Sequence, residues 1–177
     1  MRSHQLLFRT AAFCPAAAWY LVIWRFSAQP ATVSGALSDR LLYRLLEALS
    51  GVFREQSEEG KRAIVMFLSF FERKAAHMFL YFVLTGLLLL ALHGLSRGFC
   101  LKAGFSLSLC GVLAAVDEIH QRFVPGRSGE LRDVAVDLAG GAVFLLLYWL
   151  ARCVRLAHCG PVEMDQIYRK KGRWRML

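Results

Sequence analysis

The stretch HMFLYFVLTGLLLLAL, from His77 to Leu92, decides the class of this protein. With its neighbours it forms an apolar block over residues 75–95, and about 20 helical residues at ~1.5 Å each cross a hydrocarbon layer of ~30 Å. The block lacks the two-residue alternation of a barrel strand, and a helix satisfies its own backbone hydrogen bonds in lipid. The sequence therefore predicts a transmembrane helix here.

Three more apolar blocks of similar length surround this one, at residues 6–24, 99–119 and 134–151. The chain has 177 residues and is 56% hydrophobic, whereas soluble domains are about 45–50% apolar. The fold class we predict is all-α, an integral membrane four-helix bundle, and a soluble domain is excluded. The first block also fits a signal peptide loosely, but no small-x-small cleavage site follows Trp24, which favours a retained anchor.

Basic residues predict the orientation, because Lys and Arg in short loops favour the cytoplasmic side. The N-terminus, the connection at Arg97 and Lys102, and the C-terminal tail are all basic and share one side in a four-helix topology. Both termini are therefore expected in the cytoplasm, with a transmembrane domain over residues 1–155 and a basic tail over 156–177. The net charge of +9 then reflects attraction to anionic lipid rather than to nucleic acid.

The long first connection carries an amphipathic segment, residues 37–72, on the outer face. Leucines recur at helical spacing from Leu41 to Phe53 after a possible cap at Ser38/Asp39, and Gly60 separates a second apolar run, Ile64–Phe71. The pattern indicates two helices. They either lie on the outer leaflet or form a small hairpin packed on the bundle.

Ionisable residues gather at the outer ends of the predicted helices, although they are far apart in the sequence. Spacing of three or four residues puts the members from one helix on a common stripe. Because charge inside a membrane costs at least ~2.5–3.5 kcal/mol per residue, Asp137 should face the bundle and find a partner such as His77, Lys74 or an arginine. Each residue alone is more simply a structural pair, but the whole set indicates a site.

Three motifs resemble the VanZ-like family of bacterial membrane proteins: FSAQP (26–30), RKAAHMFLYF (73–82) and DEIHQRFVPGRSGELRDVAVDLAGG (117–141). The resemblance covers roughly residues 19–150 and implies a multi-pass protein of the bacterial cytoplasmic membrane. The founding member of the family is associated with teicoplanin resistance. The resemblance implies functional roles for Ser27, Gln29, Lys74, His77, Asp117, Glu118, His120, Gln121, Arg127, Asp133 and Asp137.

The leading hypothesis is a site that binds or modifies the headgroup of a cell-envelope lipid or glycan. Ser27, Gln29, Lys74, Gln121, Arg127 and Asp133 would bind substrate, with arginine forks matching phosphate or carboxylate. His77 or His120 would act as acid/base, while Asp117, Glu118 and Asp137 would orient the histidines or hold a divalent cation. Arg122 is a further candidate anion ligand, and Gly126 and Gly129 would shape the loop.

Two alternatives stay open: a small transporter or flippase, and a non-enzymatic protein that binds a partner through its outer loop. Whether the protein is an enzyme, and whether it contributes to glycopeptide tolerance, is left undecided by the residues. A metal is less favoured, because no zinc-binding or HExxH spacing is present. The cysteines lie mostly in or beside apolar blocks as small packing residues.

Overall fold

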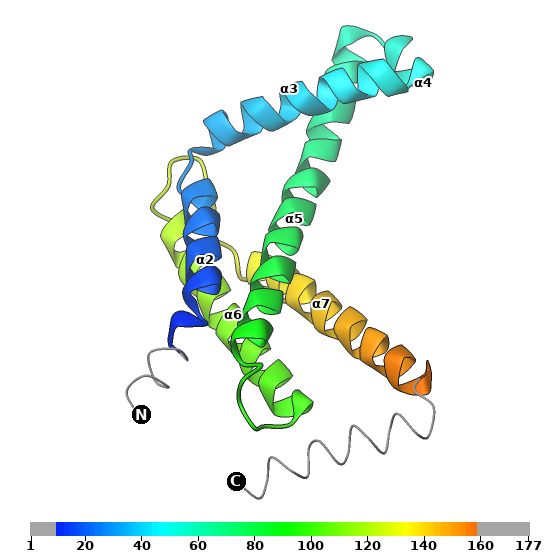
Figure 1. The fold of residues 1–177 in the computed structure, drawn as a ribbon. Helices are drawn as coiled ribbons and strands as arrows, with labels where there is room; N and C mark the ends of the chain where they lie inside the picture. Colours follow the sequence, from blue (N-terminus) through cyan, green and yellow to red (C-terminus); the bar gives the residue numbers. More distant parts are fainter. Residues whose placement is uncertain (1–9, 159–177) are drawn as a thin grey trace, which may run out of the picture. The chain divides into compact units, whose positions relative to one another are not determined.

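The computed structural model describes residues 10–158, except the side chains of Leu37 and His158. The described part is helical and contains no strand. Its helices are α2 (Cys14–Ser27), α3 (Ala31–Leu49), α4 (Gly51–Arg54), α5 (Glu58–Ala91), α6 (Phe99–Gln121) and α7 (Leu131–His158) (Figure 1). The chain divides into two compact units between Phe144 and Leu145, inside α7.

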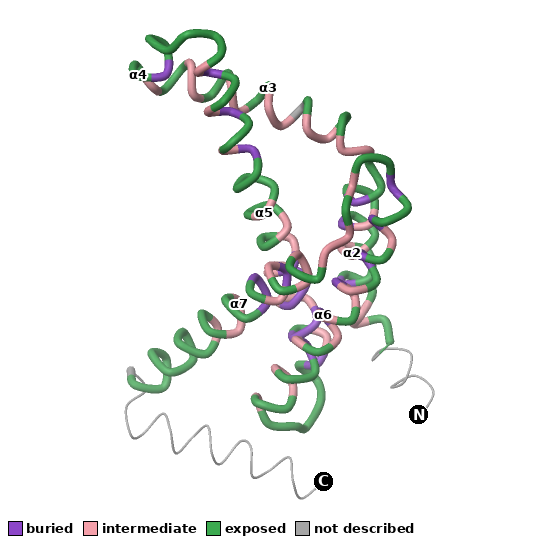
Figure 2. Tube along the Cα trace, turned by 180° about the vertical axis from the view of Figure 1, so that it is seen from behind, coloured by how far each residue is buried: buried purple, intermediate pink, exposed green. Residues whose placement is uncertain are grey.

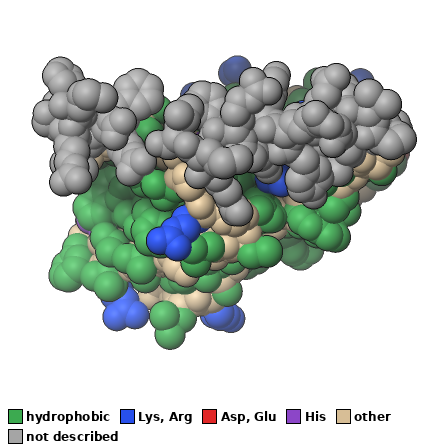
Figure 3. Space-filling model, turned by 60° about the horizontal axis from the view of Figure 1, so that its bottom comes forward, with side chains coloured by type: hydrophobic (Ala, Val, Ile, Leu, Met, Phe, Trp, Pro, Cys, Tyr) green, Lys and Arg blue, Asp and Glu red, His purple; other side chains and the backbone are tan. Residues whose placement is uncertain are grey.

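Within the described residues, three helices are long and apolar enough to cross a membrane: Glu58–Ala91, Phe99–Gln121 and Leu131–Ala157. They confirm three of the apolar blocks as helices. The first block corresponds to α2, whose 14 residues are shorter than a span, and residues 1–9 lie outside the described part. Among the described residues visible in Figure 3, hydrophobic side chains predominate, with a few separate Lys and Arg side chains.

Buried residues concentrate where α2, α5, α6 and the first half of α7 meet (Figure 2). Small residues permit this approach. A Cβ on Gly140 would overlap the backbone carbonyl oxygen of Met78 in α5, and a Cβ on Gly141 would lie 2.5 Å from Oγ1 of Thr85. In α2, the indole of Trp19 donates to the Leu80 carbonyl (2.9 Å) and the Tyr20 hydroxyl to the Leu113 carbonyl (3.0 Å). These contacts fix α2 and α7 against α5 and α6.

The predicted cap at Ser38/Asp39 is wrong, because α3 begins much earlier. Its N-cap is Pro30, with φ −53° and ψ 142°, and proline ends the preceding helix by removing a donor. No residue between Ala31 and Ser38 breaks the helix. The Ser38 hydroxyl instead donates to Glu72 of α5 (2.5 Å).

The prediction of a separate helix at Ile64–Phe71 is also wrong, because this run belongs to the 34-residue α5. Glu72, Arg73 and Lys74 are good helix formers, so the change from apolar to charged residues does not end the helix. The real start is Ser57, whose hydroxyl accepts from the Gly60 N–H (3.2 Å) as an N-cap. At ~1.5 Å per residue, α5 is about 50 Å long and extends well beyond a ~30 Å hydrocarbon layer.

A small apolar cluster joins α3 and α4 to the start of α5. Phe53 is buried and packs edge-on against Tyr43, with ring centroids 5.4 Å apart. The buried ammonium group of Lys61 lies 5.9 Å from both ring centroids and pairs with Glu58 (3.2 Å) and Glu47 (3.5 Å). This junction makes α3 and the first part of α5 a helical hairpin.

Candidate functional site

A cavity of about 750 Å³ opens where the polar ends of the helices meet. Its walls come from the start of α3, the middle of α5, the loop between α6 and α7, and the first turns of α7. The lining is both charged and apolar. It comprises Ala31, Ser34, Phe70, Phe71, Arg73, Lys74, His77, Gln121, Gly126, Arg127, Ser128, Glu130, Arg132, Asp133, Val136 and Asp137.

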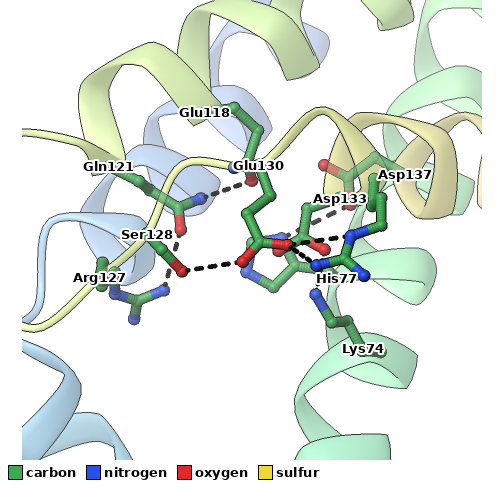
Figure 4. Close-up of polar contacts among 10 residues, drawn as sticks. Lys74, His77, Glu118, Gln121, Arg127, Ser128, Glu130, Asp133 and Asp137 are labelled. Atoms are coloured by element: carbon green, nitrogen blue, oxygen red, sulfur yellow. Dashed lines mark hydrogen bonds and ion pairs between the residues drawn. The ribbon is translucent and has the colours of Figure 1, made fainter.

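Two ionic pairs join α5 to α7 in the cavity wall. Lys74 pairs with Asp133, and Nδ1 of His77 lies 3.5 Å from Oδ1 of Asp137 (Figure 4). Lys74 and His77 lie one turn apart on α5, and Asp133 and Asp137 lie one turn apart on α7. This matching spacing explains why both pairs form between the same two helices. The Asp137 side chain is fully buried, whereas 23% of the His77 side chain is exposed. Because Nδ1 of His77 is the buried nitrogen, Nε2 across the ring is the atom that a molecule in the cavity can reach.

A buried hydrogen-bond network behind the cavity links α2, α6 and the loop. Oδ2 of Asp117 accepts from the Ser27 hydroxyl (2.6 Å) and from the Gln121 amide (3.0 Å). The same amide donates to Oε1 of Glu118 (3.1 Å), whose Oε2 accepts the Glu130 backbone N–H (2.9 Å). Buried carboxylates need such donors, because unsolvated charge is costly. The network therefore fixes the end of α6 to both neighbours.

Arg127 fastens the loop to the end of α2. Its Nε donates to the Gln29 carbonyl (2.9 Å) and its Nη2 to the Phe26 carbonyl (3.2 Å) and the Ser34 hydroxyl (3.3 Å). Nη1 donates to Oε1 of Gln121 (3.4 Å). Burial lowers the pKa of Arg127, although the group stays cationic. Four donated hydrogen bonds occupy most of the five N–H groups of a guanidinium, so Arg127 mainly holds the site together.

Glycines shape the loop, as the sequence predicts. Gly126 has φ +75°, a left-handed conformation that side chains disfavour. A Cβ on Gly129 would overlap the Glu118 carbonyl oxygen, so this glycine lets the loop approach α6 rather than a ligand. At the rim, the Arg132 guanidinium donates to Glu130 (2.7 Å and 3.1 Å) and lowers the pKa of that carboxyl.

The VanZ/LLP1 family model matches residues 12–152. This chain belongs to the VanZ/LLP1 family. All three motifs quoted above lie inside the matched range, so the resemblance predicted from them is confirmed. Neither the curated proteins nor the solved structures gave a match. With three apolar helices of spanning length, this VanZ/LLP1 protein is a multi-pass membrane protein.

The structure brings most of the predicted site residues together. Lys74, His77, Gln121, Arg127, Asp133 and Asp137 line the cavity, while Ser27, Asp117 and Glu118 are buried in the network behind it. Two residues lie elsewhere. His120 stacks on Trp24, with ring centroids 3.9 Å apart, and Gln29 is exposed and contributes its carbonyl. The candidate ligand Arg122 is exposed and does not line the cavity.

Sequence reasoning overlooked several lining residues, chiefly Phe70, Phe71, Arg73 and Ser34. Helical spacing contains a signal for one of them, because Phe70, Lys74 and His77 follow at intervals of four and three on one stripe. Ser34 gave no such signal. Its position depends on the contact between the Ala31 N–H and the Pro125 carbonyl (3.3 Å), which brings α3 to the loop.

Metal binding finds no support in the arrangement of side chains. Within residues 10–158, no group of three or more His, Cys, Asp or Glu side chains is placed to hold an ion.

Proposed function

We propose that this VanZ/LLP1 protein binds the anionic headgroup of a cell-envelope lipid or glycan in the cavity, at the non-cytoplasmic face of a bacterial membrane. The observation that carries the proposal is the cavity itself. It combines cationic side chains with a histidine held by a buried carboxylate, in about 750 Å³. Pockets of this size accommodate small organic ligands.

The charge of the lining favours an anion. Four cationic side chains and three carboxylates line the cavity: Arg73, Lys74, Arg127 and Arg132, with Glu130, Asp133 and Asp137. The Nη atoms of Arg73 make no hydrogen bond with any other described residue, so they are available to an incoming phosphate or carboxylate. The start of α7 also lies in the wall, and helix N-termini attract anions.

His77 supplies the acid/base group of the proposal. Asp137 holds Nδ1, and this orientation directs Nε2 toward the cavity, as carboxylates do for catalytic histidines. An imidazole in this position can accept a proton from a hydroxyl or a water beside the bound headgroup. The pair therefore allows the site to modify the headgroup as well as to bind it.

The membrane placement is part of the same proposal. Positive residues in the N-terminus, the connection after α5 and the C-terminal tail favour the cytoplasm, which puts the cavity outside. Family likeness to VanZ also supports a contribution to glycopeptide tolerance.

The test is anion binding by the full chain in nanodiscs of phosphatidylcholine, titrated with glycerol 1-phosphate. Replacing both members of the α5–α7 pair, Lys74→Met with Asp133→Asn, removes the cation without leaving an unpaired carboxylate. We expect affinity to fall at least about tenfold, since a charge-assisted hydrogen bond contributes ~1.5–3 kcal/mol. Arg44→Met, an exposed cation on α3, is the control and should bind like the wild type. Equal affinity in the double variant would contradict the proposal.

A further inference from the structure

Three phenylalanines form an exposed cluster directly beside the polar cavity. Phe67, Phe70 and Phe71 are 65%, 52% and 53% exposed. Their rings nevertheless contact one another edge to face, with centroids 5.1 Å apart for Phe67–Phe71 and 5.5 Å for Phe70–Phe71. Contiguous exposed apolar side chains mark interaction sites more often than single ones do.

The cluster and the cavity share one face of α5. Phe67, Phe71 and Lys74 follow at intervals of four and three. Phe70, Lys74 and His77 do the same, so the two rows adjoin and meet at Lys74 in one broad stripe. Phe70 and Phe71 line the cavity themselves, and the Lys74 ammonium lies 5.5 Å from the Phe70 ring centroid. Along this stripe the surface changes within two turns from aromatic to charged.

A ligand that consisted of a headgroup alone would leave the exposed phenylalanine cluster largely uncovered. We propose that the ligand is an anionic amphiphile, a lipid of the envelope, whose charged group occupies the cavity at Lys74 and His77 while its hydrocarbon chain packs on Phe67, Phe70 and Phe71. This inference rests on the proposed function and names its substrate class. The inference distinguishes a lipid from a soluble glycan or phosphate. Only a lipid has both a charged group for the cavity and a hydrocarbon chain for the phenylalanine cluster.

A chain-length series tests the inference on the full chain in phosphatidylcholine nanodiscs. The probes are ethyl phosphate and hexyl phosphate, which share the anion and differ by four methylene groups. Full burial of one methylene tightens binding about fourfold. For a partly covered chain we expect hexyl phosphate to bind at least about tenfold more tightly than ethyl phosphate, after subtraction of binding to empty nanodiscs.

One substitution and one control test whether the hydrocarbon chain packs on the phenylalanine cluster. Phe71→Ala should reduce the preference for hexyl phosphate over ethyl phosphate by severalfold. Phe79→Ala alters an equally exposed phenylalanine of α5 that does not line the cavity, and should keep the full preference.

The outcomes separate this inference from the proposed function. Equal affinity of the wild type for the two phosphates overturns the amphiphile inference and leaves the anion site standing. Retention of the full preference in Phe71→Ala also overturns it, because the chain then lies elsewhere. Absence of binding by either phosphate above empty nanodiscs overturns both. The wild-type series decides the question even where a variant fails to fold.

Discussion

Replacing Gly140 with alanine should remove most of the folded protein. The added Cβ would overlap the Met78 carbonyl oxygen and lie 2.8 Å from its carbonyl carbon. These are backbone atoms inside α5, so they cannot move aside as a side chain does. Overpacking of a core usually costs ~1–3 kcal/mol, and a clash with backbone belongs at or above the top of that range. The free energy of unfolding in nanodiscs, monitored by tryptophan fluorescence, measures this effect.

Gly104→Ala is the matched control for this substitution. Gly104 also lies within a long apolar helix, α6, and a Cβ there would meet nothing within 4 Å. Alanine is the better helix former by about 1 kcal/mol, so this variant should be as stable as the wild type or slightly more stable. If the two alanine variants have the same stability, α7 does not pack on α5 as described.

Replacing Arg127 with alanine should destabilise the protein by about 2–4 kcal/mol. The substitution removes hydrogen bonds to two carbonyls at the end of α2, to Ser34 and to Gln121. Bonds from a charged donor contribute ~1.5–3 kcal/mol each and are not additive within one network. Lysine keeps the charge but lacks the planar fork, so Arg127→Lys should recover little stability. Thermal unfolding of the purified chain measures both variants.

Arg122→Ala is the control for Arg127. Arg122 is exposed, and its guanidinium makes no hydrogen bond among residues 10–158, so its loss should change stability by no more than ~0.5 kcal/mol. Equal unfolding temperatures for the Arg127→Ala and Arg122→Ala variants would show that the guanidinium of Arg127 is free to bind ligand instead of fastening the loop.

The membrane helices could be predicted because length and composition decide whether a segment crosses lipid. The sequence also indicated His77 as one of several possible partners of Asp137, since a buried aspartate needs a partner and topology put both residues at one end. Which of the candidates pairs with Asp137 came from the structure. Both inferences use only physics that holds for any bundle. The sequence predicts the approximate position of the polar site because the topology brings the ionisable residues of several helices to the same end of the bundle.

Other features depend on tertiary contacts that no local pattern contains. Asp117, His120 and Gln121 were expected on one stripe, but His120 and Gln121 differ by 100° around the helix. Gln121 faces the buried network, while His120 turns to the Trp24 ring. The sequence predicts that Arg127 binds an anion. It contains no signal for the hydrogen bonds from Arg127 to the end of α2, because these depend on the contact between the loop and α3. The sequence predicts separate segments at Ile64–Phe71 and 75–95, whereas α5 continues through the charged residues Glu72, Arg73 and Lys74 between them.

We propose that an anion-binding cavity opens on the non-cytoplasmic side of the membrane. The most direct test is labelling of a Ser128→Cys variant by a membrane-impermeant maleimide in intact bacterial cells, with the five native cysteines replaced by alanine. Ser128 is exposed and lines the cavity. We expect the maleimide to label the Ser128→Cys variant from outside the cell, and we expect added glycerol 1-phosphate to slow this labelling. Labelling that occurs only after the cells are permeabilised would contradict it.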